Sequence, residues 1–422
     1  MLKFIFIFIT GILFLPLSSV LYAEQTFSIE DLTRIALKKS RQIRAKEAGL
    51  KSIDGAVKQT KSWQNPDLSV VYGNKSESSS SLTGIGNERS SGYYYSIAIS
   101  QPFYAPGKNK SQIKVQETLR QDAKVALDET VISVYMSVIY LSYGYKEILE
   151  HLEHMDERYK RFSLIYSYLN SRAFVSSQKR TEKYLIENQM RMLEKEIQNE
   201  KIKKEIIWKK LNVYLELEKP VSIKAGWFSK GHPLNREDIL KNIKENPLLK
   251  KQRILLERKK IENDLAKTEK YPDYEVSAIY SEEKATQRDR YMGAGLTFRL
   301  PVWNRSKGNI AFSEAELNAS REESIYLENK IITDLEVMFI EYENRRSIIQ
   351  KLPLRLIETV HREMREADLS FRKGQLDISV YLELEKSASE LHAAVFDSQL
   401  EYVESYLKIL SMTGRMNFQE EK

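Results

Sequence analysis

One long stretch of this sequence almost lacks the residues that break helices. Between Gln112 and Glu218 there is no proline and a single glycine, Gly144. Proline and glycine are the residues that most disfavour a helix interior, so a run of this length predicts very long helices. As one helix, Gln112–Leu169 would span roughly 85 Å at ~1.5 Å per residue. The rest of the fold must be compatible with a rod of that size.

We expect the rod to turn back once, at Asn170–Ser177. The next segment, Gln178–Leu217, carries sparse apolar residues among Lys and Glu. A narrow apolar seam between charged faces is typical of a coiled coil. The sequence therefore predicts a long antiparallel helical hairpin.

The long helices begin at two similar junctions. The first, Gln101–Gln112 (QPFYAPGKNKSQ), follows the strand-like run Gly92–Ser100. The second, Arg299–Gly308 (RLPVWNRSKG), follows a strand-like run and opens a glycine-free run to Lys373. Two such junctions in one chain predict an internal repeat.

Short segments with period-two alternation precede each junction. Each has one apolar face and one small or polar face, which predicts amphipathic strands. The four segments are Leu68–Asn74, Tyr93–Gln101, Tyr274–Ser281 and Tyr291–Arg299. The polar stretches Ser76–Ser91 and Glu282–Arg290 are predicted to be the loops between paired strands.

Helices are predicted before each strand pair and after the second junction. Ser28 and Asp31 look like a capping box at the start of Phe27–Ser62, and Arg236–Lys270 is the equivalent helix of the second half. Pro353 should kink the second long helix. Its turn is expected at Arg372–Asp377, followed by a return helix to Met412.

Composition indicates the class of protein, and the N-terminus indicates the cellular compartment. With 30% charged and 42% hydrophobic residues, the chain resembles neither a disordered protein nor a helical membrane bundle. Lys3, the apolar run Phe4–Leu15 and the site at Ala23 predict a secretory signal peptide over residues 1–23. Beyond it we find no apolar run near the ~18 residues of a spanning helix. Cysteine is absent, which excludes disulfides and thiol chemistry.

Four amphipathic strands need partners. An open sheet with an apolar face is prone to aggregate, and a sheet in a membrane must close into a barrel. Two copies of this chain would supply eight strands, which leave no open lumen, and three would supply twelve, which can enclose a pore. The fold class predicted is mainly α with a membrane β-barrel contribution: two repeats of helix, two strands and a long helical hairpin. A trimer would form a 12-stranded barrel continued by an α-helical tunnel.

The order and duplication of these pieces resemble the TolC-like outer membrane efflux proteins, over nearly all of Phe27–Arg415. The junction at Leu300–Gly308 resembles the heavy-metal efflux branch of that family most. The motifs that carry the resemblance are Trp63-Gln-Asn-Pro66, Ser100-Gln-Pro-Phe103 with Gly107-Lys108, Leu300-Pro-Val-Trp-Asn-Arg305 with Gly308, and Ser370–Glu383.

The resemblance implies a homotrimeric duct in the outer membrane with a helical tunnel in the periplasm. It also implies two partners, a periplasmic adaptor and an inner-membrane pump, with metal cations or drugs as the cargo. The hairpin tips would dock the adaptor through Ala173, Val175, Ser176, Gly374 and Gln375. By the same resemblance the first repeat covers residues 24–219, an equatorial linker 220–233, the second repeat 234–415 and a tail 416–422.

The resemblance also suggests which residues close the periplasmic end. Glu383 stands where the family carries a tunnel-closing carboxylate, with Asp377 and Glu385 close by. Three symmetry copies of one carboxylate would make a negative ring that binds cations. Glu383 could equally be a solvated coiled-coil residue. Lys179 stands where the first tip can carry an acid, and it could pair with Glu383 of a neighbouring hairpin.

No catalytic or cofactor motif stands out, so we predict neither an enzyme nor a cofactor. His151 and His154 lie three apart on a helix, but we see no further metal ligand nearby and expect them to be exposed without a metal. Two alternatives to efflux stay open: a type I protein secretion duct, and an envelope coiled-coil scaffold without a pore.

Overall fold

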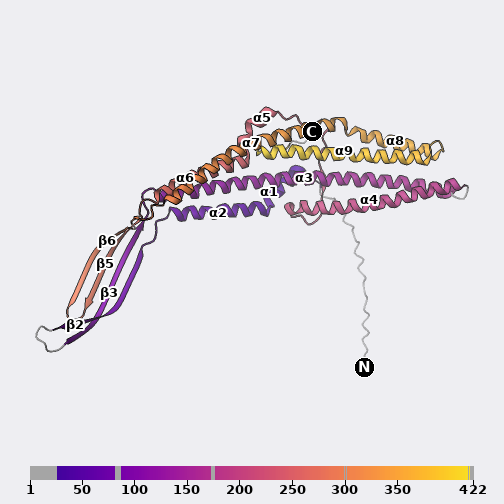
Figure 1. The fold of residues 1–422 in the computed structure, drawn as a ribbon. Coiled ribbons are helices and arrows are strands. Elements are labelled where there is room, and N and C mark those ends of the chain that lie inside the picture. Colours follow the sequence, from indigo (N-terminus) through magenta and orange to yellow (C-terminus); the bar gives the residue numbers. More distant parts are fainter. Residues whose placement is uncertain are drawn as a thin grey trace, which may run out of the picture.

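The computed structural model describes residues 26–80, 87–172, 176–298, 300, 302–416 and 418. The molecule is elongated, with the long strands projecting from one end of a helical body and the tips of two helical hairpins at the other end (Figure 1). The predicted signal peptide, residues 1–23, lies outside the described residues.

Two strands followed by long antiparallel helices occur twice along the chain. The first half contains β1 (Thr26–Ser28), α1 (Ile29–Lys39), α2 (Arg41–Lys61), β2 (Asp67–Ser80), β3 (Asn87–Phe103), α3 (Lys108–Arg172) and α4 (Ser177–Leu215). The second half contains β4 (Ser222–Lys224), α5 (Arg236–Lys241), a 3-10 helix (Asn242–Glu245), α6 (Pro247–Thr268), β5 (Tyr274–Lys284), β6 (Arg288–Phe298), α7 (Lys307–Lys351), α8 (Arg355–Arg372) and α9 (Ile378–Met412).

The four long strands form one antiparallel sheet in the order β2-β3-β5-β6. The central pair joins the two halves of the chain, with Ile97 of β3 opposite Tyr280 of β5. All four strands are longer than the segments predicted from alternation.

The two predicted loops were therefore too long. Within Ser76–Ser91, the β2–β3 ladder continues to the pair Ser80–Asn87. Within Glu282–Arg290, the β5–β6 ladder continues to Lys284–Arg288. Backbone hydrogen bonds hold the extended parts of the strands together. A polar segment without alternating apolar residues can therefore still belong to a strand.

The helix predicted over Phe27–Ser62 starts with a strand and is interrupted at Ser40. Ser28 caps α1, accepting a hydrogen bond from the backbone N–H of Asp31, whose carboxylate accepts one from the Ser28 backbone. The capping box is thus confirmed. Strand β1 pairs in parallel with β4, which lies inside the predicted linker 220–233. This pairing joins the start of the described chain to its middle.

The rod-like helices pack closely. Gly144, the single glycine of the first rod, is buried in α3, and a Cβ at this position would lie 3.1 Å from Cδ1 of Ile207 in α4. The turn between α3 and α4 falls at the predicted place. In the second half the rod is two helices, because Pro353 follows the end of α7 and lacks the N–H that a continuous helix requires.

One window of α3 does reach the length and composition of a membrane span, with a mean hydropathy of 1.4. The expectation that no apolar run near this length follows the signal peptide was therefore wrong. A third of this window is buried (33%), and the buried residues of α3 that include Val138 and Tyr143 belong to the central core. A single helix of this kind is weak evidence for a membrane span, and its length and composition alone do not place it in a membrane.

Buried side chains form two separate cores. The central core lies around the β1–β4 pair and includes Leu32, Leu211, Phe228 and Tyr402. The second core lies towards the hairpin tips and joins Phe162 and Ile186 of the first hairpin to residues of α8 and α9. The two hairpins are therefore packed against each other far from the sheet.

Candidate functional site

The sheet has one apolar face that the described chain leaves uncovered. Register places Leu68 opposite Ile99, Val70 opposite Ile97 and Val276 opposite Leu296, and these side chains share one face. All six are exposed. The opposite face carries mostly small or polar residues such as Ser69, Ala98 and Gly295, with Val71 and Ile279 among the exceptions. The alternation read from the sequence therefore marks real faces of the sheet.

Aromatic clusters bound this apolar face at both ends. At the helical end, Phe103 stacks on Tyr274 with 5.2 Å between ring centroids, and Trp63 meets Phe103 edge-on at 6.0 Å. At the far end, the hydroxyls of Tyr93 and Tyr280 donate to the carboxylate of Glu282, at 2.8 and 3.2 Å.

The spacing of the two clusters fits a bilayer. On β3 they are ten residues apart, at Phe103 and Tyr93, or about 33 Å along the strand at about 3.3 Å per residue. A strand tilted by about 40° would turn this into an apolar band about 25 Å tall, which is the height of the band in outer-membrane barrels. The far end of this band is charged: Glu282, which lies opposite Tyr95, contacts Arg290 at 3.0 Å.

The tip of the second hairpin is held by a glycine turn. Gly374 has a positive φ of 73°. Its N–H donates to the carbonyl of Phe371 and the N–H of Gln375 donates to that of Ser370, both at 2.9 Å. This left-handed glycine cap ends α8 and lets the chain reverse into α9. In the first tip, Ser176 caps α4 by accepting from the N–H of Lys179 at 3.2 Å, while Ala173 and Val175 lie outside the described residues.

The carboxylates predicted near the aperture occupy contrasting environments. Glu383 and Asp377 are exposed on α9 and at its start. Glu385 is fully buried and bridges two arginines of α3: its Oε2 lies 3.1 Å from Nε of Arg158 and its Oε1 lies 2.8 Å from Nε of Arg161. Glu385 thus ties the two hairpins together within one chain.

Lys179, predicted to pair with Glu383 of another hairpin, bonds within its own helix. Its Nζ lies 2.7 Å from Oε2 of Glu182, a buried carboxylate on the next turn. The amide of Gln178 also donates to Glu182, at 3.1 Å. The inter-hairpin pairing remains a prediction.

The histidines differ from expectation. His154 is buried at 4% exposure rather than exposed, and His361 of α8 and His392 of α9 lie beside it. Neither histidine was predicted as a neighbour of His154, because both are over 200 residues away in the chain. Only a prediction of how the two hairpins pack against each other could have brought them into consideration. A second group, Glu147, His151 and Asp397, lies on the same helices.

The fold matches several solved membrane proteins. A membrane protein from Pseudomonas aeruginosa aligns with 91% of this chain and 93% of its own, at a TM-score of 0.74 and 13% identity. CusC aligns with 92% of both chains, at 0.73 and 11%. The CmeC outer membrane channel of Campylobacter jejuni aligns with 92% of this chain and 85% of its own, at 0.70 and 11%. At 11–13% sequence identity, these structural matches establish a shared fold.

The described chain therefore has the fold of these solved membrane channels. Residues 32–172 match the model of the family described as outer membrane efflux protein, and no curated protein sequence matches the chain. Residues 32–172, about a third of the chain, are thus similar in sequence to outer membrane efflux proteins. Both comparisons include proteins of the outer membrane.

Proposed function

We propose that this protein is one subunit of a homotrimeric duct that conducts exported molecules across the outer membrane. The observation that carries the proposal is the four-stranded sheet, with its exposed apolar face bounded by two aromatic clusters. In the described chain, the outer edges of β2 and β6 have no neighbouring strand. In hydrocarbon such edges must be paired, and symmetric copies of the same sheet can pair them.

The strand number favours three copies. A membrane barrel needs at least about eight strands, and a barrel of that size is filled by its own side chains. Three sheets of four strands make a twelve-stranded barrel, which can enclose a water-filled lumen. The helical hairpins of three subunits would then continue the lumen into the periplasm as a tunnel.

The partners follow from the position of the hairpin tips. We infer that a periplasmic adaptor binds around Ser176, Gly374 and Gln375 and connects the duct to an inner-membrane pump. The exposed carboxylate of Glu383 would line the narrow end of the tunnel in three copies. Such a ring attracts cations and repels anions.

Metal cations and drugs are both compatible with this duct as cargo. A duct for a secreted protein is the alternative within the same architecture. A scaffold without a pore is disfavoured by the apolar strand face, which such a scaffold would not need.

Two neighbouring substitutions on β6 test whether the apolar face contacts lipid. Met292 lies on the apolar face and Tyr291 on the opposite one, and both side chains are exposed. Met292 lies opposite Tyr280, near the middle of the apolar face, and lysine on a lipid-facing strand position costs about 2–4 kcal/mol near the bilayer midplane. Met292→Lys should therefore lower the amount of folded protein in purified outer membranes, while Tyr291→Lys should not. Equal loss in both variants, or none in either, would contradict the assignment of faces.

A further inference from the structure

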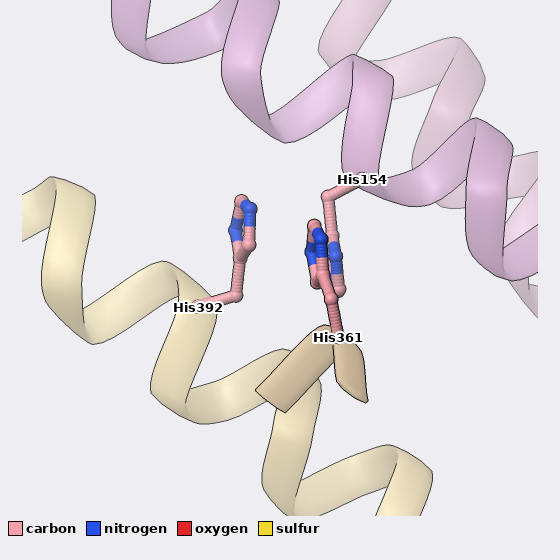
Figure 2. A group of neighbouring side chains, drawn as sticks. All are labelled: His154, His361 and His392. Carbon is pink, nitrogen blue, oxygen red and sulfur yellow. The ribbon is translucent and has the colours of Figure 1, made fainter. Parts of the chain in front are cut away.

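Four of the five histidines of this chain gather in one region of the helical body. His151 and His154 lie on α3, His361 on α8 and His392 on α9. The imidazoles of His154, His361 and His392 come from three helices of two different hairpins and meet between them (Figure 2). One nitrogen from each lies within 4.8 Å of the other two.

Two of these imidazoles are buried, and two carry ring nitrogens without a hydrogen-bond partner among the described residues. His154 and His392 are each 4% exposed. Neither ring nitrogen of His154 has a hydrogen-bond partner among the described residues, and the same is true of Nε2 of His361. A buried polar atom without a partner costs free energy, so natural proteins rarely leave several in one place without a reason.

The rings are arranged as a stack. His154 and His392 have centroids 3.9 Å apart, and the three ring planes lie within 8–16° of one another. In a tetrahedral zinc site the Zn–N distance is about 2.0–2.1 Å, so ligand nitrogens stand roughly 3.4 Å apart. The nitrogens here must approach by up to about 1.4 Å, and the stacked rings must also turn, because the lone pair of an imidazole nitrogen lies in the ring plane. Rotation about the soft χ2 torsion of histidine can supply both changes.

We propose that His154, His361 and His392 bind a divalent transition-metal ion of the zinc class. Three imidazoles and an open fourth position form a familiar zinc coordination set, and neutral imidazole also suits copper, nickel and cobalt. The ion would join α3 of the first hairpin to α8 and α9 of the second. The site does not depend on the proposed transport function, since it could be present in a channel with any cargo.

The surroundings are consistent with neutral ligands. Burial lowers the pKa of His154 to about 2 and that of His392 to about 3. The neutral imidazole, which is the form that binds metal, is therefore the one present at neutral pH. Arg158 and Arg161 lie near His154, and their charge is balanced in part by the buried carboxylate of Glu385.

Zinc titration of the detergent-purified full chain, cleared of metal with a chelator, tests the proposal. We expect one Zn²⁺ per chain by isothermal titration calorimetry. His361→Gln should weaken binding by at least ~10-fold, because it removes a ligand. His361 is only partly buried, so this variant should fold. His232→Gln is the matched control, since His232 lies outside both histidine groups, and its affinity should equal that of the wild type.

Cobalt gives a second readout that does not depend on heat signals. Co²⁺ bound by three imidazoles should show visible d–d absorption, and His361→Gln should lose it. Asp397→Asn tests the neighbouring group of Glu147, His151 and Asp397. Absence of Zn²⁺ binding in the wild type would overturn the proposal. So would binding that survives His361→Gln but is lost in Asp397→Asn.

Discussion

The carboxylate of Glu385 lies 2.8 Å from the guanidinium of Arg161, and this contact joins the second helical hairpin to the first. Arg158 holds the other oxygen of the same carboxylate. Glu385 is completely buried, and the two arginine side chains are only 12% and 15% exposed. A carboxylate in this position is a fixed structural charge of the single chain, unlike the exposed Glu383 two residues earlier.

Removing Glu385 should destabilise the protein strongly. Glu385→Ala would leave two buried arginines without their partner, and breaking a buried ion pair in this way costs about 3–5 kcal/mol. Glu383→Ala is the control, because truncating an exposed side chain changes stability by less than about 0.5 kcal/mol. Denaturation of the two detergent-purified variants compares them directly. Similar midpoints for both would contradict the role assigned to Glu385.

Stability near Glu147 should fall as pH rises. Burial, with the neighbouring carboxylate of Asp397, raises the pKa of Glu147 to about 8, and Glu200 adds to the rise while Lys203 opposes it. A carboxyl whose pKa is raised in the fold contributes stability below its ordinary pKa of 4.5, and that stability is lost as pH rises through about 8.

Glu147→Gln should accordingly stabilise the protein by about 1–3 kcal/mol at pH 8–9 and have little effect at pH 4–5. Thermal denaturation across this range measures the difference. Glu153→Gln, on an exposed position of the same helix, is the control and should show no such trend. A stabilisation by Glu147→Gln that is equal at all pH values would mean that its charge is not the cause.

Local pattern predicted a large part of the fold. Period-two alternation located all four strands and their faces, and the absence of helix breakers located the rods and both hairpin tips. The same patterns underestimated the strands, because Ser76–Ser80 and Asn87–Ser91 pair through backbone hydrogen bonds that leave no mark in side-chain polarity. The pairing of β1 with β4 was missed because three-residue strands carry no usable period.

The buried polar residues were harder to predict. Glu383 and Glu385 look alike in the sequence, and only the packing of α9 against α3 buries one of them. His154 and His392 meet for the same reason, across more than 200 positions of sequence. Such contacts depend on how two separately predicted hairpins are rotated against each other, which helical periodicity does not determine.

The turn at the second tip should tolerate no side chain at Gly374. Its φ of 73° is left-handed, a conformation that costs other residues about 1–2 kcal/mol. Gly374→Ala should therefore accelerate hydrogen exchange of amides at the ends of α8 and α9. Gly308→Ala lies in the first turn of α7, where a Cβ would meet no atom within 4 Å. That variant should be neutral or slightly stabilising, and equal effects of the two would show that the glycine turn is unimportant.

The central claim is that copies of this chain form a channel, and conductance in a planar lipid bilayer tests it most directly. The detergent-purified protein should open discrete, cation-selective channels. Glu383→Ala should reduce that selectivity or raise the conductance, because it removes the proposed ring of carboxylates. Unchanged selectivity and conductance in Glu383→Ala would support the duct but show that its constriction lies elsewhere. A protein that is soluble without detergent and opens no channels would contradict the account.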